Sequence, residues 1–545
     1  MEAADKFYLT TAIAYANNKP GLHTLYEVIG ADVLARWNRL CGRPTRFLTG
    51  TDEHSVNIAQ RAAAEGIPTA VFVDEKVALF RQAQETLLIR PDRFIRTSDP
   101  DHIHAAQELV RRAYAAGDIY FGKYEGWYCP AEGFKTAADV ESPTGPRCPD
   151  HPGLELLWLS EPNWFFKLSA YQKRLEAHFA AHPDFVAPAF RRNEVLGLLA
   201  AGPEDFSISR TGSDWGIPFP LLPDGSSSLR PDGSYDPAAG TIYVWFDALA
   251  NYLTGAGFPH DQASFSRWWP ADLQIIGKDI SKFHALYWPA ILWSAGLEAT
   301  KSIWVHGWLL SGGDRHSKSR GNFLDPLEKV NSLGADGIRY AALREVPFDA
   351  DAEATWPTFI HRYNTDLANN WGNLHKRVTS LVNLYLGGVR QAPSGQTALA
   401  TLWPGILATY SSKLEARLLH EALGGLWSFC DAANRLIEVE KPWALAKVAA
   451  DETETPKVRA AARARLAAVL GDLAEACRLF ALASAPFLPA TAPVALGQLG
   501  YPYPYDEKGA GGPPIAEELR WGAHASETGI ITPANAPLFP RLPEE

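Results

Sequence analysis

The amino-acid sequence predicts an α/β protein whose parallel sheet is split by an inserted segment and followed by a bundle of helices. Strand-like and helical stretches alternate near the amino end of the chain. This alternation stops between about 118 and 235, returns near 240, and gives way after about 350 to helical periodicity alone. The chain has 545 residues, too many for one hydrophobic core, so several domains are expected.

The amino-acid composition limits the classes of protein to which the chain can belong. Hydrophobic residues make up 46% of the chain and charged residues 21%, as is usual for a globular protein. We expect a cytoplasmic protein without membrane contact, because no signal peptide opens the sequence and no apolar run approaches the length of a membrane span. Five scattered cysteines do not indicate a disulfide framework. The net charge of −11 argues against indiscriminate nucleic-acid binding but allows a local basic face.

The first predicted unit is a strand, a helix and a second strand. FYLTTAIA, starting at residue 7, alternates like a strand, and RFLTGTDEH contains a second strand at about 45–49. Between them a helix is expected to begin near Gly21 and end near Gly42, because apolar residues recur with helical spacing at Leu25, Ile29, Val33, Trp37 and Leu40. Such a unit binds ligands at the carboxyl ends of its strands. Further helices are predicted at about 57–64, 70–87 and 102–116.

The rest of the chain divides by pattern. The segment 118–235 has short aromatic strands, Pro/Gly turns and a Cys/His cluster, and it reads as an insertion. Strand-like stretches starting near 240, 273 and 301 predict the second half of the sheet. Helices with apolar faces at 362–386, 413–438 and 457–485 predict the bundle. The tail from 501, rich in proline and glycine, is expected to pack loosely on the body.

One loop carries a pattern suited to nucleotide chemistry. In DRHSKSRGNFLDP, at 314–326, serines and cations lie between glycines, so Lys318 can meet the charge that develops on a leaving pyrophosphate. By itself this pattern is more often a solvated basic loop. RHSKS at 315–319 resembles the KMSKS loop of class I aminoacyl-tRNA synthetases, and GLHT at 21–24 stands where that class has its HIGH signature.

Further stretches resemble one family of that class, the methionyl-tRNA synthetases. They are TAIAYAN, GADVLAR, FLTGTDEH, RRNEV, DFSISR, YVWFDALANYL, IGKDI, FHALYWPA, NTDLANNWGNL and KPW, which run in order over most of residues 7 to about 485. The resemblance implies a class I synthetase fold: a Rossmann-type parallel sheet split by an inserted domain and followed by an α-helical anticodon-binding bundle. The implied domains are two catalytic halves at 1–117 and 236–300, the connective insertion at 118–235, a KMSKS-like and stem-contact region at 301–350, the bundle at 351–500 and a tail at 501–545.

The resemblance also implies an activity. Methionine and ATP would form methionyl-adenylate with Mg²⁺ present, and the methionyl group would pass to tRNA(Met). We expect a monomer. Two alternatives stay open: a diverged paralogue that activates methionine or an analogue without tRNA, and a catalytically silent tRNA-binding protein. Residues that read an anticodon argue against the first, whereas a changed ATP-facing turn favours the second.

The site residues implied by the resemblance fall into three groups. Asp52 would meet the substrate ammonium, and the methionine side chain would be held by Ile13, Tyr15, Trp245, Ala248, Leu249, Tyr252, Ile280 and His284. Aromatic rings suit a polarisable thioether. ATP would be bound by Gly21, His23, Thr24, Gly277, Lys278, Asp279, Ser317, Lys318 and Ser319, with Lys318, Thr24 and His23 acting in catalysis. The anticodon would be read by Asn373, Arg377 and Trp443.

The ATP-facing turn departs from the family pattern. Where the family has two histidines flanking a glycine, this chain has Gly21, His23 and Thr24. His23 places a side chain where the family's glycine lets adenine approach the backbone. The metal-binding pattern is altered as well, since a glutamate replaces one cysteine of the family's zinc knuckle. A structural zinc would be held by Cys129, Glu132, Cys148 and His151.

Overall fold

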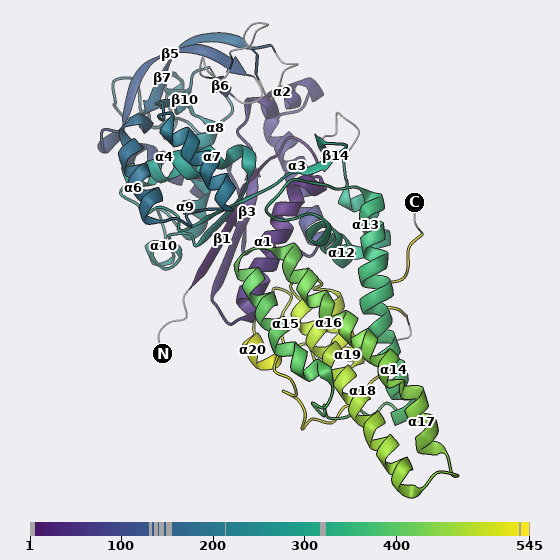
Figure 1. Cartoon of the computed structure of the whole chain (residues 1–545). Helices are drawn as coiled ribbons and strands as arrows, with labels where there is room; N and C mark the ends of the chain where they lie inside the picture. The colour runs from purple at the N-terminus through teal and green to yellow at the C-terminus, as the bar shows by residue number, and fades with distance from the viewer. Residues whose placement is uncertain are drawn as a thin grey trace.

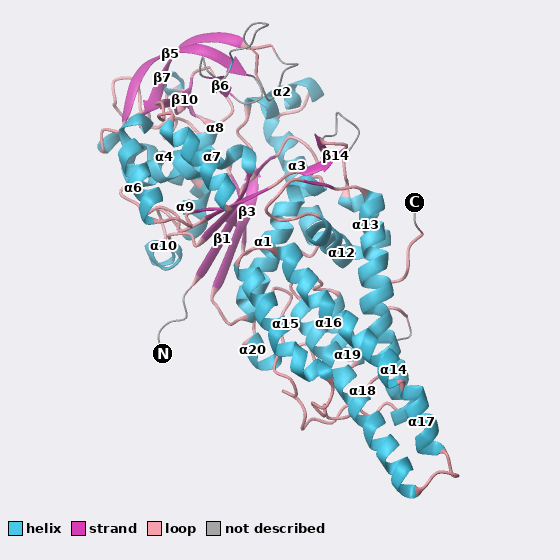
Figure 2. Ribbon diagram, in the orientation of Figure 1, coloured by secondary structure: helices cyan, strands magenta, loops and turns pink. Residues whose placement is uncertain are grey.

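A computed structural model describes residues 6–129, 133–135, 140, 147–148, 155–212, 214–316, 323–533 and 536–543. The molecule is elongated, with the parallel sheet and the inserted segment at one end and a helical arm at the other (Figure 1). The strands gather in one half and the arm consists of helices (Figure 2). The predicted α/β sheet followed by a helical bundle is therefore confirmed.

A parallel sheet forms the centre of the half that is expected to be catalytic, called the catalytic half below. Its strands run in the order β2-β3-β1-β12-β13-β8, and β4 pairs with β3. Their bounds are β1 Phe7–Thr11, β2 Ala14–Tyr15, β3 Thr45–Asp52, β4 Arg93–Arg96, β8 Val186–Ala187, β12 Leu273–Gly277 and β13 Ile303–His306. In β1, Leu9 pairs with Leu273 on one side and with Phe47 on the other. The first and second halves of the chain therefore meet at β1.

One of the stretches expected to supply the second half of the sheet does not join it. The stretch that starts near 240 forms β11 (Thr241–Ile242), which pairs antiparallel with β10 (Ser209–Arg210), and then two short helices, α8 (Val244–Leu249) and α9 (Asn251–Ala256). The prediction that this stretch contributes a strand to the parallel sheet is wrong. A short apolar run buried on all sides looks the same whether it is strand or helix, so periodicity could not separate the two.

The inserted segment is built on a long antiparallel hairpin. β5 (Ile119–Cys129) pairs with β7 (Leu157–Phe166), and β6 (Gly133–Lys135) and β9 (Phe206–Ser207) extend the sheet in the order β6-β5-β7-β9. α6 (Gln172–Ala181) and α7 (Ala189–Ala200) follow the hairpin. β8 lies between these two helices and pairs in parallel with β13, so the central sheet takes its edge strand from inside the range expected for the insertion.

Helices cover the sheet and build the arm. In the catalytic half they are α1 Leu22–Leu40, α2 Val56–Glu65, α3 Thr69–Thr86, α4 Pro100–Ala115, α10 Gln262–Trp268 and α11 Trp288–Ser294. A small sheet in the order β15-β14-β16 follows, with β14 Leu309–Ser311, β15 Asp314–Arg315 and β16 Ala352–Glu353. The arm comprises α12 Pro326–Glu345, α13 Trp356–Arg362, α14 Asn373–Leu386, α15 Ala398–Glu415, α16 Leu419–Glu440, α17 Pro442–Ala450, α18 Pro456–Ser484, α19 Thr491–Gln498 and α20 Ile515–Glu518. The predicted helix 413–438 is interrupted at Arg417, whose φ is 62°.

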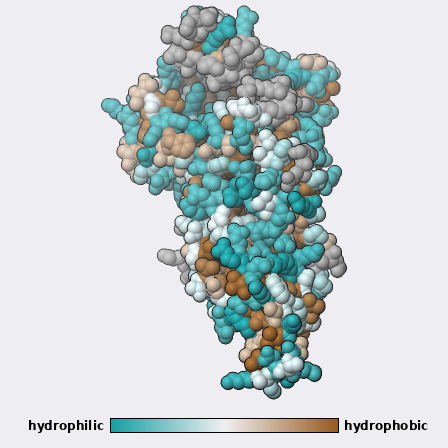
Figure 3. Space-filling model, turned by 45° about the vertical axis from the view of Figure 1, so that its right-hand side comes forward, coloured by the Kyte–Doolittle hydropathy of each residue, from teal (hydrophilic) through white to brown (hydrophobic). Residues whose placement is uncertain are grey.

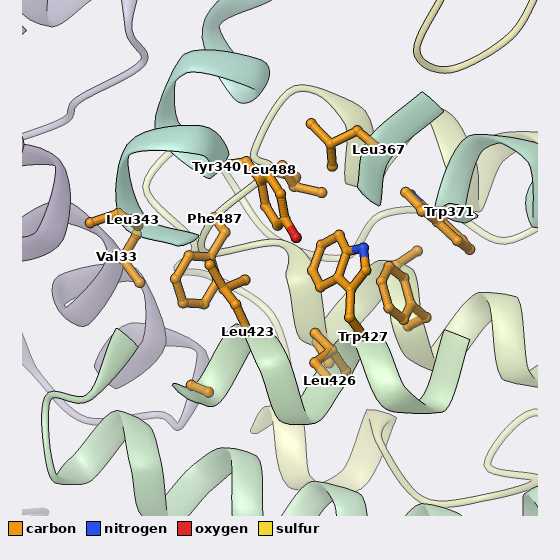
Figure 4. Close-up of a cluster of buried hydrophobic side chains, with 14 of the residues drawn as sticks. Val33, Tyr340, Leu343, Leu367, Trp371, Leu423, Leu426, Trp427, Phe487 and Leu488 are labelled. Carbon is orange, nitrogen blue, oxygen red and sulfur yellow. The ribbon is translucent and has the colours of Figure 1, made fainter. Parts of the chain in front are cut away.

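The catalytic half and the arm share one hydrophobic core. Val33 of α1 packs with Leu343 of α12, and the same cluster continues to Trp427 and Phe487 in the arm (Figure 4). Arg339 of α12 is fully buried beside it and donates to the Asp32 carboxylate at 2.8 Å and to two carbonyls of the segment after α18. Helix α1, which opens the candidate site, is therefore fixed directly to the arm.

The carboxyl-terminal tail packs closely, which corrects the expectation of loose packing. Trp403 Nε1 donates to the carbonyl of Leu519 at 2.6 Å, and Arg36 Nη1 donates to the carbonyl of Glu507 at 2.6 Å. Tyr501, Tyr505, Ile515, Leu519, Ile531 and Phe539 all belong to the shared core. Proline and glycine prevented regular structure but did not prevent burial, because the aromatic and aliphatic residues between them supply the apolar area.

The face of the molecule drawn in Figure 3 is mostly hydrophilic. In the view of Figure 3 the hydrophobic surface gathers over the helical arm. Large exposed hydrophobic residues of the arm include Leu384, Leu402, Val439 and Trp443. No helix among the described residues has the length and apolar character that crossing a membrane requires.

Candidate active site

A cavity of about 420 Å³ opens at the carboxyl ends of β1, β3, β12 and β13. This is the edge at which open parallel sheets bind their ligands, and the volume is typical of small-molecule sites. The lining comes from the turn after β1, the first turns of α1, the end of β3, the α8–α9 segment, the segment after β12 and the stretch that follows β13. Both halves of the catalytic region therefore contribute to one site.

Every residue predicted for the methionine pocket lies on this cavity. Trp245 stacks on Phe283 with ring centroids 4.0 Å apart, and Tyr15 meets the edge of Trp245 at 6.5 Å. These rings make an apolar wall. In the same part of the cavity as these rings, the buried Tyr252 hydroxyl lies 2.7 Å from His284 Nε2.

The hydrogen bonds fix the tautomer of that histidine. His284 Nδ1 lies 3.1 Å from the carbonyl of Ile280, which can only accept, so Nδ1 carries the proton. Nε2 is then an acceptor for the Tyr252 hydroxyl. Burial lowers the pKa of His284 to about 4, so the ring is neutral at physiological pH. The polar groups at this end of the cavity are therefore oriented without adding charge.

Asp52, the last residue of β3, places a carboxyl group in this part of the cavity wall. It lies next to His54, whose backbone N–H donates to Asp52 Oδ1 at 3.4 Å. His54 Nδ1 in turn lies 2.7 Å from Asp247 Oδ2 of α8. Burial, followed by the charge of Asp247, raises the pKa of Asp52 well above its usual range. A cation that reaches Asp52 from the cavity therefore meets a strongly desolvated carboxyl group.

The part of the cavity expected to bind ATP, here called the nucleotide end, is lined by His23 and Thr24 of α1, by Gly277 at the end of β12 and by Asp279. Of the predicted ATP residues that the structure describes, Lys278 and Gly21 lie outside this lining. Lys278 is directed to the Asp351 carboxylate and over the Trp308 ring, with its Nζ 3.8 Å from the ring centroid. Gly21 is the N-cap of α1 and is absent from the lining residues.

Close packing explains the glycine at position 21. A Cβ there would lie 2.4 Å from Phe323 and 2.8 Å from the ring of His23. Phe323 meets the His23 ring edge-on with centroids 5.9 Å apart, and the N–H of Leu22 donates to the carbonyl of Leu324 at 2.9 Å. The first turn of α1 is therefore packed against the chain that returns from the KMSKS-like loop.

A buried carboxyl–imidazole pair at this end was not predicted from the sequence. Glu27 of α1 accepts from the N–H of Ala12 at 2.6 Å, and its other oxygen lies 2.9 Å from His306 Nε2. His306 Nδ1 lies 2.7 Å from the carbonyl of Gly307, so Nδ1 carries a proton, and Nε2 shares a second proton with the Glu27 carboxyl group. Burial lowers the pKa of His306, but the hydrogen bond and charge of Glu27 outweigh this and raise it.

Trp308 and His316 also line the cavity, and neither was predicted from the sequence. His306 and Trp308 lie at and just beyond the carboxyl end of β13, a strand that periodicity had located. The rule that ligands bind at the carboxyl ends of parallel strands was therefore a usable signal for them. Glu27 had no such signal, because its helix spacing does not distinguish it from a surface residue.

Several predicted site residues lie outside the described residues. These are Ser317, Lys318 and Ser319 of the KMSKS-like loop, and Glu132 and His151 of the predicted zinc knuckle. Cys129 and Cys148 are described, fully buried, and packed in a small cluster with Val140 and Leu156. Within the described ranges no group of three or more histidine, cysteine or acidic residues is arranged to hold a metal ion.

The predicted anticodon residues lie along the helical arm, away from the cavity (Figure 1). Asn373 and Arg377 are both on α14, and Arg377 donates to the Glu438 carboxylate of α16 at 2.5 Å. Trp443, at the start of α17, is 41% exposed, a large fraction for an indole ring. The arm therefore carries an aromatic side chain that can stack on a base and polar side chains that can form hydrogen bonds.

Comparison with known proteins places the chain in a family. The family model described as tRNA synthetases class I (M) matches residues 7–379. The methionine–tRNA ligase of Mycobacterium leprae is 44% identical over 503 residues, 91% of this chain and 89% of that protein. That of Thermotoga maritima is 36% identical and covers 98% of this chain, with 80% of its own length matched.

Solved structures of the same family also superpose on this chain. The structure of Mycobacterium tuberculosis methionyl-tRNA synthetase in complex with methionyl-adenylate superposes with a TM-score of 0.86 and 40% identity, covering 98% of this chain and 100% of that one. The free form of the same protein superposes with a TM-score of 0.80 and 38% identity, covering 99% of each chain. The chain therefore belongs to the methionyl-tRNA synthetases of class I.

Proposed function

We propose that the chain is a methionine–tRNA ligase. It joins methionine to ATP as methionyl-adenylate, releases pyrophosphate, and transfers the methionyl group to tRNA(Met). The observation that supports this most is the single cavity at the carboxyl ends of the strands, where the predicted methionine residues adjoin the amino end of α1. The methionyl-adenylate complex of the Mycobacterium tuberculosis relative supports the same reaction.

At the methionine end, binding follows from the contacts. The Asp52 carboxylate accepts the substrate ammonium, and the aromatic wall around Trp245 holds the polarisable thioether. The neutral pair of Tyr252 and His284 orients the side chain without introducing charge. The substrate carboxylate is then free to attack the α-phosphorus of ATP, so the protein supplies position and charge but no covalent intermediate.

At the nucleotide end, the amino end of α1 directs the positive end of its dipole toward the phosphates. Thr24 and His23 donate hydrogen bonds there. Lys318 meets the charge that builds up on the leaving pyrophosphate. Mg²⁺ accompanies ATP and neutralises part of the charge on its phosphates when bound.

The inserted domain would hold a structural zinc. Cys129 and Cys148 are buried thiols in neighbouring positions of one small cluster, and thiolate is a preferred zinc ligand. Glu132 and His151 would complete a tetrahedral set. We expect one zinc per chain by elemental analysis of the purified protein, and Cys148→Ser should lose it; a metal-free wild-type protein contradicts this assignment.

The helical arm would read the anticodon of tRNA(Met), and the enzyme would work in the cytoplasm, where charged tRNA is used. Trp443 offers a face on which a loop base stacks, and such stacking contributes about 1–3 kcal/mol. Trp443→Ala should weaken charging through the KM for tRNA and leave pyrophosphate exchange unchanged. Leu402→Ala, at another exposed apolar residue of the arm, is the matched control. Equal harm to exchange and charging contradicts the assignment.

The experiment that tests the whole function has two stages. Methionine-dependent exchange of labelled pyrophosphate into ATP reports activation, and acylation of tRNA(Met) reports transfer. Both reactions are expected. Exchange without acylation instead identifies a paralogue that activates methionine without tRNA, and neither reaction, with tRNA binding retained, identifies a silent tRNA-binding protein.

A further inference from the structure

Four ionisable side chains are buried together behind the methionine end of the cavity. We call them the aspartate–histidine cluster: Asp52, His54, His102 and Asp247. Asp247 has no exposed surface and bridges the two imidazoles, with Oδ2 at 2.7 Å from His54 Nδ1 and Oδ1 at 2.7 Å from His102 Nε2. His102 Nδ1 lies 3.2 Å from Thr254 Oγ1. Asp52 alone among the four lines the cavity.

The contacts decide where some of the protons lie. A carboxylate without a proton only accepts, so His54 carries a proton on Nδ1 and His102 carries one on Nε2. Burial lowers the pKa of His54, but Asp247 and, less strongly, Asp52 outweigh burial and raise it above its usual 6.5. Burial would raise the pKa of Asp247, but the two imidazoles outweigh it and lower the pKa. Asp247 is thus the ionised centre of the cluster.

The other charged groups around the cluster, two carboxylates and one arginine, leave no positive charge to balance Asp52. Glu53, next to Asp52, accepts from Arg96 at 2.6 and 3.0 Å and from the hydroxyl of Ser98 at 2.6 Å. Arg96 also pairs with Asp74 at 2.7 Å. Trp215, whose ring packs against His54 with centroids 5.6 Å apart, carries no charge and donates to the carbonyl of Glu53. The cluster must therefore balance the charge of Asp52 with its own protons.

Two buried carboxylates close together are costly unless protons or cations neutralise them. Without substrate, the cluster does this with protons on Asp52 and His54. We infer that the substrate ammonium takes over this role at Asp52, so that binding of methionine releases a proton from the aspartate–histidine cluster to the solvent. This inference rests on the proposed function and adds His54 and His102 to it as positioning residues for amino-acid recognition.

The sign of the pH dependence follows from linkage. The pKa of Asp52 and of His54 is raised in the free protein, and a bound ammonium nearby lowers both by like-charge repulsion between the ammonium and the bound protons. A ligand that releases protons binds more tightly as the pH rises. One full proton corresponds to about a tenfold gain in affinity per unit of pH, and the gain ends once the free cluster has lost the proton.

Titration calorimetry of the full chain with methionine measures the released protons directly. At one pH near neutrality, titrations in two buffers that differ in heat of protonation should give different apparent enthalpies, and the slope should correspond to a release of about half to one proton. The analogue of methionine that lacks the amino group is the matched ligand control and should release none. Identical enthalpies for methionine in both buffers overturn the inference.

Two variants locate the source of the proton. His54→Asn keeps a nitrogen that can donate to Asp247 but cannot titrate, and His102→Gln keeps a donor to the other oxygen of Asp247. His54→Asn should bind methionine and release fewer protons, with a flatter pH profile of affinity. His104→Gln, at an exposed histidine of α4, the helix that also carries His102, is the control and should behave like the wild type. Undiminished release in His54→Asn overturns the inference. Absence of methionine binding by the wild type instead contradicts the proposed function.

Discussion

The two ends of the cavity are built in different ways. The methionine end is formed by side chains of regular, buried elements, such as Tyr252 of α9 and Asp52 of β3, each held by a hydrogen bond. The nucleotide end would depend on the first turn of α1 and on the loop after β15, part of which lies outside the described residues. On the proposed function, amino-acid recognition is fixed by the packed core, whereas ATP binding depends on one turn and one loop.

The largest effect is expected at the loop. Lys318→Ala should lower the rate of pyrophosphate exchange about a hundredfold to a thousandfold, because removing one group that stabilises developing charge has an effect of this size. Methionine binding measured by calorimetry should not change, since the methionine end does not depend on the loop. Lys329→Ala on α12 controls for the loss of one positive charge. An equal loss of methionine binding would show that the methionine end and the nucleotide end of the cavity do not act independently.

A smaller effect is expected at the methionine end. Tyr252→Phe removes the hydroxyl that donates to His284 Nε2 and leaves a buried acceptor without its partner, at a cost of about 1–3 kcal/mol. The KM for methionine in the exchange reaction should rise about tenfold or more, and the KM for ATP should stay the same. A change confined to ATP would show that this pair serves the nucleotide end and would contradict the pocket assignment.

Much of the fold followed from periodicity, whereas the site followed from the family resemblance. The strands β1, β3, β12 and β13 and the helical arm were predicted correctly, because their apolar spacing is regular over long stretches. No local pattern links Asp52 to Trp245 or His284, which lie far apart along the chain. Only the resemblance brought these residues together before the structure did, and their roles stay predictions.

The remaining features could not be read from the sequence because each depends on a contact between distant segments. His306 pairs with Glu27 across the sheet, and Asp247 bridges two histidines from β3–α2 and α4. β8 is only two residues long, too short to carry a periodicity. The tail was misjudged because its proline and glycine content indicated mobility, while its buried aromatic residues decided the packing.

The smallest effect tests whether the glycine at position 21 is required by its close packing against Phe323 and His23. If Gly21 is required because Phe323 and the His23 ring fill the space beside it, Gly21→Ala should raise the KM for ATP about fivefold to tenfold, since overpacking a close contact costs about 1–3 kcal/mol. Phe323→Ala removes the nearer of the two obstacles, so the double variant should recover part of the loss. The His23 ring, the farther obstacle, can rotate away because it is a side chain rather than backbone. Strict additivity of the two changes in exchange assays would show that the two positions do not interact, and the glycine would then have no packing explanation.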